Sequence, residues 1–126
     1  MTTAAMGHTR WVIPEGYIPA QSHGPAPEMV SHDCFCVLNT GDSPAQVRVT
    51  IYYSDRDPVG PYTLTVPARR TRHVRFNSLT DPAPIPVATD YASVIEADHP
   101  IVVQYTRLDS RQAENALLST IAYPAA

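Results

Sequence analysis

The sequence predicts an all-β protein: a single-domain antiparallel β-sandwich, jelly-roll-like, with about eight short strands. The chain has 126 residues, a length typical of one domain. Its 13 prolines are about twice the usual share of ~5%, and a proline inside a helix costs ~3 kcal/mol or more. Between the prolines, apolar and polar residues alternate with the period of two that marks a half-buried strand. We expect residues 1–9 to form a flexible N-terminal segment and residues 10–126 to form the domain.

The first part of the chain is expected to hold three strands, at residues 10–13, 34–38 and 46–53. The clearest is 46–53, in which valine and isoleucine alternate with arginine and threonine. The short apolar run 34–38 ends at Asn-Thr-Gly-Asp, a sequence that accepts the backbone angles of a turn. We therefore expect 34–38 and 46–53 to form an antiparallel hairpin.

Four further strands are expected, at residues 62–66, 71–76, 92–97 and 101–107. Residues 67–70 join the first two as a hairpin, and a turn at 98–100 with the sequence Asp-His-Pro separates the last two. A proline-rich connector at residues 81–86 lies between the two pairs. It cannot form a helix, because proline restricts its own backbone angles and disfavours helical angles in the residue before it.

The C-terminal stretch allows two interpretations. Asp109 could begin a helix with Gln112 as its capping-box partner. The alternation of residues 116–123 instead favours a strand. We expect a polar turn at 109–114 and a closing strand over 116–123.

Composition narrows the class of protein. The formal net charge of −3 argues against a wholly basic surface for nucleic acid, and two cysteines are too few for a disulfide-rich scaffold. The sequence shows neither a signal peptide nor an apolar run near the ~18–20 residues that cross a bilayer. We expect a soluble, cytoplasmic protein, and attachment at the periphery of a membrane receptor would leave no trace in such patterns.

All the fixed positive charge comes from arginine, and four arginines gather in one segment with a histidine: Arg69, Arg70, Arg72, His73 and Arg75. If the apolar residues of this segment face the core, His73 and Arg75 share the opposite face. Such a cationic hairpin could bind a carboxylate, a phosphate, an acidic partner or another subunit. In an oligomer it could also bind nucleic acid. The alternative is a solvated edge hairpin whose charges discourage aggregation.

The run His32, Cys34 and Cys36 resembles a metal-ligating cluster. Residues two apart on a strand are ~6.6–7 Å apart, whereas two ligands of one zinc ion lie within ~4 Å of each other. The same spacing disfavours a disulfide. We therefore expect no metal site, and two small thiols buried on a core face.

No motif predicts an enzyme. Ser31, His32 and Asp33 are the residue types of a hydrolytic triad, but adjacent strand residues point to opposite faces. The sequence contains no nucleophile elbow, phosphate loop or dinucleotide fingerprint. We expect neither catalysis nor a cofactor.

Two groups of residues are candidates for binding a small ligand. Trp11, Glu15 and Tyr17 could form a stacking platform with a polar anchor; the alternative is that Trp11 fills the core and Glu15 belongs to a turn. The loop that begins at Arg107 is rich in hydrogen-bonding groups that could bind a ligand. The alternative is that these groups pair with one another inside the loop, with Asp109 as one partner.

Long runs of the chain resemble the sensory rhodopsin transducer family. The resemblance covers most of the chain from about residue 10 onward. It is carried by Trp11, EGYIP at 15–19, TIYYSD at 50–55, 58–71, HVRFN at 73–77, DPAPIP at 81–86, and TRLDSRQAEN at 106–115 with the residues that follow through Tyr123. The cysteine pair and the absence of lysine depart from the family pattern.

The resemblance implies a small cytoplasmic β-sandwich protein that assembles as a homotetramer. It implies a partner of the microbial sensory rhodopsin type, while the wider superfamily implies binding of small molecules of the sugar type. It does not by itself assign roles to residues.

Our leading hypothesis is a non-enzymatic signalling or sensing module that binds a small polar ligand, a partner protein, or both. We expect Trp11 to stack, Glu15 to contact hydroxyl groups or a cation, and anionic or hydroxyl groups to be bound by Arg70, His73 and Arg107. Binding of one small ligand requires the five residues to meet in one concave pocket of ~300 Å³ or more. A dedicated adaptor for a membrane photoreceptor, with no ligand of its own, would instead spread them over a flat face.

Overall fold

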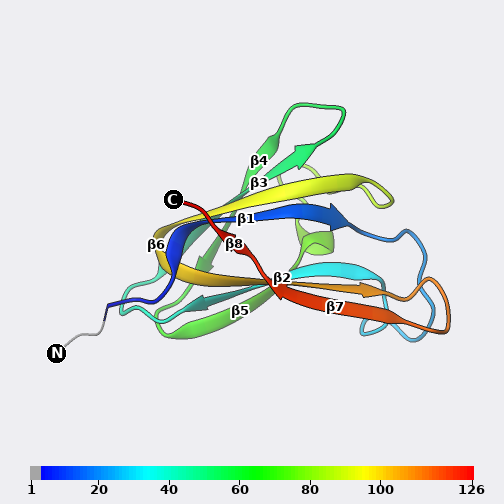
Figure 1. Ribbon diagram of the computed structural model, residues 1–126, viewed down its shortest axis with the longest axis horizontal. Coiled ribbons are helices and arrows are strands. Elements are labelled where there is room, and N and C mark those ends of the chain that lie inside the picture. Colours follow the sequence, from blue (N-terminus) through cyan, green and yellow to red (C-terminus); the bar gives the residue numbers. More distant parts are fainter. Residues whose placement is uncertain (1–3) are drawn as a thin grey trace.

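The computed structural model describes residues 4–126, and this part of the chain holds eight strands and one short 3-10 helix (Figure 1). In chain order these are β1 (His8–Tyr17), β2 (His32–Asn39), β3 (Ala45–Tyr53), β4 (Val59–Val66), β5 (Arg70–Arg75), η1 (Phe76–Ser78), β6 (Asp90–Asp109), β7 (Ala116–Ile121) and β8 (Tyr123–Pro124). The predicted all-β class is confirmed. Strand β1 begins at His8, within the segment expected to be flexible, and residues 1–3 of that segment lie outside the described residues. Among residues 4–126, no helix has the length and apolar character needed to cross a membrane.

The strands form two layers that share β6 (Figure 1). Sheet A has the order β4-β3-β6-β1-β8, and its β6 residues lie within 90–101. Sheet B has the order β5-β2-β6-β7, and its β6 residues are 102–109. All pairings are antiparallel. The two layers are thus one continuous sheet folded over along β6.

The turn expected at residues 98–100 is wrong, because β6 is a single strand of 20 residues. Ala97 pairs with Val47 in sheet A and Val102 with Leu38 in sheet B, so the chain stays extended while its partners change. Pro100 lies at this change of partner, where its missing N–H removes no essential ladder bond. The Asp-His-Pro sequence therefore marks a passage between sheets and not a reversal of the chain.

The two expected hairpins are also wrong. Strand β2 pairs with β5 and β6, while β3 pairs with β4 and β6, so neither the β2–β3 nor the β4–β5 connection closes a hairpin. Both connections cross from one sheet to the other. Asn39 fastens them together, because its buried amide nitrogen donates to the carbonyls of Ser43 and Val66 (2.9 and 3.1 Å) and its oxygen accepts the Gly41 N–H (2.9 Å).

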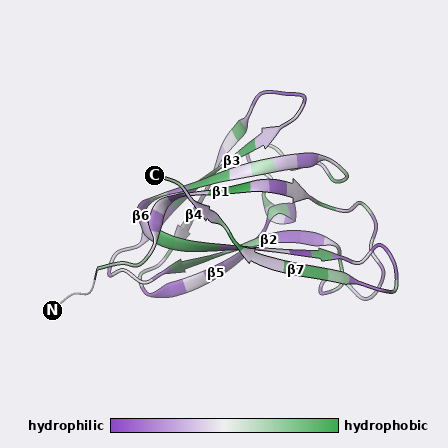
Figure 2. Cartoon of the chain, in the orientation of Figure 1, coloured by the Kyte–Doolittle hydropathy of each residue, from purple (hydrophilic) through white to green (hydrophobic). Residues whose placement is uncertain are grey.

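The core fills the space between the two sheets, because apolar and polar residues alternate along the strands (Figure 2). An aromatic chain runs through it: Phe35 and Phe76 have ring centroids 4.9 Å apart, and Phe76 and Tyr91 5.3 Å. All three rings are buried. Phe76 belongs to η1, so the short helix anchors the connector that follows β5 to the core.

The C-terminal prediction is confirmed in its main point, since a strand begins at Ala116 and the alternative helix is absent from the described chain. The closing strand is nevertheless divided. Strand β7 pairs with β6 in sheet B, the buried Ala122 follows, and β8 then pairs with β1 in sheet A. The end of the chain therefore ties the two layers together along one side.

Candidate functional site

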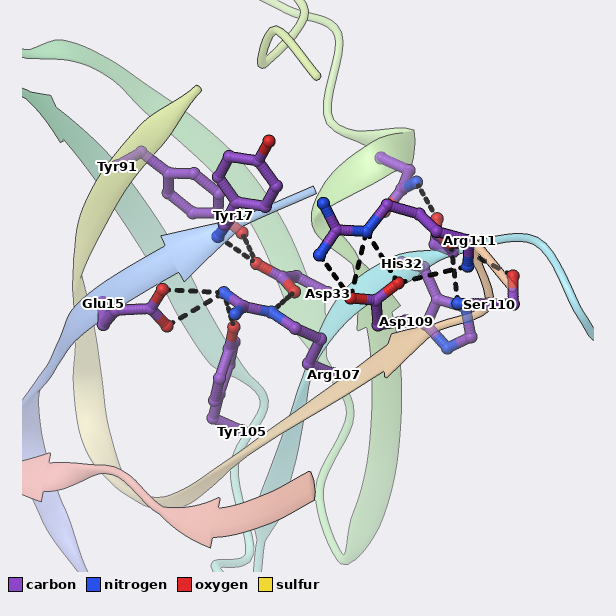
Figure 3. Close-up of polar contacts among 12 residues, drawn as sticks. Glu15, Tyr17, His32, Asp33, Tyr91, Tyr105, Arg107, Asp109, Ser110 and Arg111 are labelled. Carbon is purple, nitrogen blue, oxygen red and sulfur yellow. Dashed lines mark hydrogen bonds and ion pairs between the residues drawn. The ribbon is translucent and has the colours of Figure 1, made fainter. Parts of the chain in front are cut away.

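A polar cluster between the two sheets is centred on the Arg107 guanidinium (Figure 3). Its Nε donates to Asp33 Oδ1 at 2.8 Å, and one terminal nitrogen donates to both oxygens of Glu15 at 2.9 and 3.1 Å. Asp33 comes from β2, Arg107 from β6 and Glu15 from β1. The β2–β6 register sets Asp33 directly opposite Arg107, so the pairing of the strands itself builds the ion pair.

The three charged groups differ sharply in exposure. The Asp33 side chain is 0% exposed and that of Arg107 16%, whereas that of Glu15 is 65% exposed. Burial lowers the pKa of Arg107, but the hydrogen bond to Asp33 and its charge outweigh this, so the pKa lies above its usual range. The arginine thus neutralises a fully buried carboxylate on one side and presents a solvated carboxylate on the other.

Tyrosines complete the cluster. Tyr91 donates its hydroxyl to Asp33 Oδ2 at 2.6 Å, and the backbone N–H of Tyr17 donates to the same oxygen at 2.8 Å. Arg107 donates to the Tyr105 hydroxyl at 2.9 Å. Burial, and next the Asp33 charge, raise the pKa values of Tyr91 and Tyr105, so both hydroxyls stay protonated at neutral pH.

Gly16 allows the Tyr91 ring to lie against β1. A Cβ atom at position 16 would lie 2.4 Å from the ring, so any side chain there would displace Tyr91. The glycine in the EGYIP run is therefore needed for the hydrogen bond between Tyr91 and Asp33.

A second ion pair lies at the rim of the cluster (Figure 3). Arg111 donates to Asp109 at 2.6 Å, and its guanidinium carbon lies 5.8 Å from the centre of the Tyr17 ring. The hydrogen bond from Arg111 lowers the pKa of the Asp109 carboxyl. Pairing within this loop is thus confirmed for Asp109 and Arg111, whereas Arg107 turns inward.

The other expected ligand residues do not join this cluster. Trp11 is buried in the core, and its indole N–H donates to the carbonyls of His8 and Ile101 at 3.0 and 2.9 Å. Arg70 and His73 lie on β5, at the edge of sheet B. Of the five residues, only Glu15 and Arg107 come together, and the single pocket expected from all five is not formed by the described residues.

The arginine segment is an edge strand and not a hairpin, since β5 pairs only with β2. Val74 packs against the core, so His73 and Arg75 do share the outer face. All four arginines are held by this chain: Arg69 by an ion pair with Asp42, and Arg70, Arg72 and Arg75 by backbone carbonyls. These contacts leave less of their charge available to a partner.

The expectation of buried thiols on a core face is wrong. Phe35 faces the core, so Cys34 and Cys36 on either side of it face outward, half-buried and free. Burial, and next the charge of Cys36, raise the pKa of the Cys34 thiol to about 12. Among residues 4–126, no group of three or more His, Cys, Asp or Glu side chains is arranged to hold a metal ion.

Two grooves flank the polar cluster. One, of about 240 Å³, is lined by Glu15, Tyr52, Tyr53, Asp90 and Tyr91, with backbone and small side chains between them. The sequence interpretation missed Tyr52, because it occupies an outward-facing position in the alternation of β3 and so resembles any other exposed residue of a strand.

The second groove, of about 400 Å³, is almost wholly apolar and follows the passage from β7 to β8. Tyr105, Ile121 and Tyr123 line it together with residues of β1. The groove thus lies between Tyr105 of the polar cluster and the exposed C-terminal strands that form its other side.

Comparisons with known proteins agree over most of the chain. The family model described as Anabaena sensory rhodopsin transducer matches residues 6–124. Among solved structures, the Anabaena sensory rhodopsin transducer is 61% identical with a TM-score of 0.75, covering 82% of this chain and 99% of the other. The crystal structure of a Thermotoga maritima protein is 33% identical with a TM-score of 0.85, covering 94% and 96%. A search of curated proteins finds no match.

Proposed function

Since the chain belongs to the Anabaena sensory rhodopsin transducer family, we propose that it is a non-enzymatic signalling module that acts by binding a partner protein. The partner is a membrane photoreceptor of the sensory rhodopsin type, and the chain works at its cytoplasmic periphery as a homotetramer. The family resemblance supports the partner class.

The observation that carries this proposal is an apolar strip on the C-terminal strands. Leu117, Leu118, Ile121 and Tyr123 are between 50 and 70% exposed, and β7 has no buried residue. Figure 2 shows the apolar character of this exposed strand. Leu117 and Ile121 share one face of β7, because residues an even number of positions apart on a strand point the same way, whereas Leu118 points to the other face. Exposed apolar side chains of this kind are typical of protein contacts, and the adjoining groove of about 400 Å³ offers a pocket for an anchoring side chain.

We expect the double variant Leu117→Asp/Ile121→Asp to lose binding to the source organism's sensory rhodopsin held in lipid nanodiscs. The two carboxylates would be buried without partners at the contact, so the affinity should fall at least ~30-fold, the effect of losing one strong anchor. Titration calorimetry measures the affinity.

The control is Val87→Asp, which places one such carboxylate at an exposed apolar residue outside β7 and β8. It should bind like the parent protein. Sedimentation velocity on all three proteins separates a partner contact from a subunit contact. If the double variant dissociates into monomers, or keeps its affinity, the strip is not the partner surface.

A second candidate function is binding of a small polar ligand of the sugar type. The groove beside the polar cluster favours it, because an exposed ring, Tyr52, lies near two carboxylates, Glu15 and Asp90. Aromatic rings stack on sugar faces, and carboxylates accept hydrogen bonds from hydroxyl groups. Arg107 serves this site by holding the Glu15 carboxylate at the rim.

We expect one member of a panel of sugars and organic acids to raise the thermal midpoint of the protein. A ligand at 100 times its Kd adds ~2.7 kcal/mol to the free energy of unfolding. Tyr52→Ala should abolish the rise without changing the unliganded midpoint, whereas Tyr123→Ala, an exposed tyrosine elsewhere, should retain it. A rise that survives Tyr52→Ala would place the ligand elsewhere, and a panel without any rise would contradict ligand binding.

Nucleic-acid binding through the arginine segment has less support. Arg69 forms an ion pair with Asp42. The other arginines of the segment lie on the edge strand β5 and donate hydrogen bonds to backbone carbonyls. A specific contact with phosphates would have to displace these bonds.

A further inference from the structure

Two free thiols lie side by side on the outer face of sheet B. Cys34 and Cys36 occupy alternate positions of β2, with the core residue Phe35 between them. Cys36 also lines an open groove of about 340 Å³ on this face, so a small ion can reach its thiol from solvent.

The spacing of the pair selects a coordination geometry. Alternate residues of a strand lie ~6.6–7 Å apart, and each sulfur can lean ~1 Å toward the other by rotation about χ1. The resulting separation of ~4.5–5 Å is too long for two ligands of a tetrahedral zinc ion. It fits a linear S–metal–S arrangement, in which the two sulfurs lie on opposite sides of the ion and are farther apart than two neighbouring ligands of a tetrahedral ion.

The neighbours of the pair favour a soft ion of low charge. Across the strand pairs, Cys34 faces Arg75 and Thr106, and Cys36 faces His73 and Gln104. These two rows contain no carboxylate, the ligand that hard divalent cations prefer. Arg75 lies directly opposite Cys34 on β5, so a positive charge stands beside the position that a metal-bound sulfur would occupy.

We propose that Cys34 and Cys36 together bind one soft monovalent metal ion of the Cu(I) type in linear coordination. Each thiol releases its proton to solvent and donates a sulfur electron pair to the ion. The two thiolates and the ion carry one net negative charge, which the Arg75 guanidinium opposite Cys34 balances. The site is independent of the polar cluster around Arg107, which lies between the sheets.

The test is an anaerobic titration of the protein with Cu(I) in competition with bicinchoninate, a coloured Cu(I) chelator. We expect one ion per chain and an ultraviolet thiolate-to-metal absorption band. Two donors held on one strand act with a high effective concentration, so Cys34→Ser and Cys36→Ser should each weaken binding at least ~100-fold. X-ray absorption of the wild-type complex should show two sulfur ligands.

The variant His73→Ala tests the nearest additional donor, the imidazole opposite Cys36. It should keep the affinity within threefold, because two sulfurs complete the coordination. Independent binding of one ion to each cysteine, equal affinity in a single-cysteine variant, or a nitrogen ligand in the absorption spectrum would overturn the proposal. Because the spectrum is measured on the wild-type protein, the proposal stays testable if a serine variant fails to fold.

Discussion

Replacing Arg107 with methionine is expected to lower the free energy of unfolding by about 3–5 kcal/mol. The loss arises because Asp33 is fully buried and the arginine is its charged partner, at 2.8 Å. Tyr91 and the Tyr17 N–H would remain as donors but cannot neutralise the carboxylate. Urea unfolding followed by circular dichroism measures the change.

The matched control is Glu15→Gln, which removes the other carboxylate bound by Arg107. The Glu15 side chain is largely exposed, so its loss should cost under ~1 kcal/mol. The double variant Asp33→Asn/Arg107→Met should be less destabilised than the sum of its single changes by ~1 kcal/mol or more, since no buried charge is left. A cost below ~1 kcal/mol for Arg107→Met would show that the pair contributes little to stability.

Replacing Phe76 with alanine is expected to cost about 3–5 kcal/mol, because it opens a cavity in the middle of the aromatic chain. The ring is fully buried and lies between Phe35 and Tyr91, with centroids at 4.9 and 5.3 Å. The surrounding strands belong to two sheets and cannot both collapse into the space. The midpoint of urea unfolding should fall while the slope of the transition stays the same.

Leu118→Ala serves as the comparison, since it removes a large apolar side chain from an exposed position. It should change the free energy of unfolding by no more than ~0.5 kcal/mol. Equal effects of the two substitutions would mean that Phe76 is not the centre of the core.

Local patterns predicted the strands but not their partners. The alternation over β3 follows directly from the sequence, because a strand exposed on one face must alternate. The start of β7 at Ala116 also agrees with the predicted closing strand, although no residue of β7 is buried. The two wrong hairpins came from turn chemistry: the Asn-Thr-Gly-Asp sequence bends the chain equally well within a sheet and between sheets. The assignment to a sheet depends on long-range pairing, as Asn39 shows by joining the two crossovers.

The candidate site was predicted in part. Glu15 and Arg107 were both expected at a binding surface, and their contact joins residues 92 positions apart. Asp33 was missed, because its position beside Ser31 and His32 drew attention to a triad while its real partner lies on β6. Trp11 was expected to stack on a ligand, but both bonds of its indole are made inside the fold.

The central position of β6 has a consequence for the order of folding during synthesis. Strands β1 to β5 contain only two pairings among themselves, β3 with β4 and β2 with β5, and these belong to different sheets. The nascent chain therefore has no strand that joins its layers until residues 90–109 leave the ribosome. Assembly therefore begins late, when β6 becomes available as the strand that pairs with β1, β2 and β3. Before β6 is synthesised, these strands have unpaired edges, so aggregation is most favoured during this period.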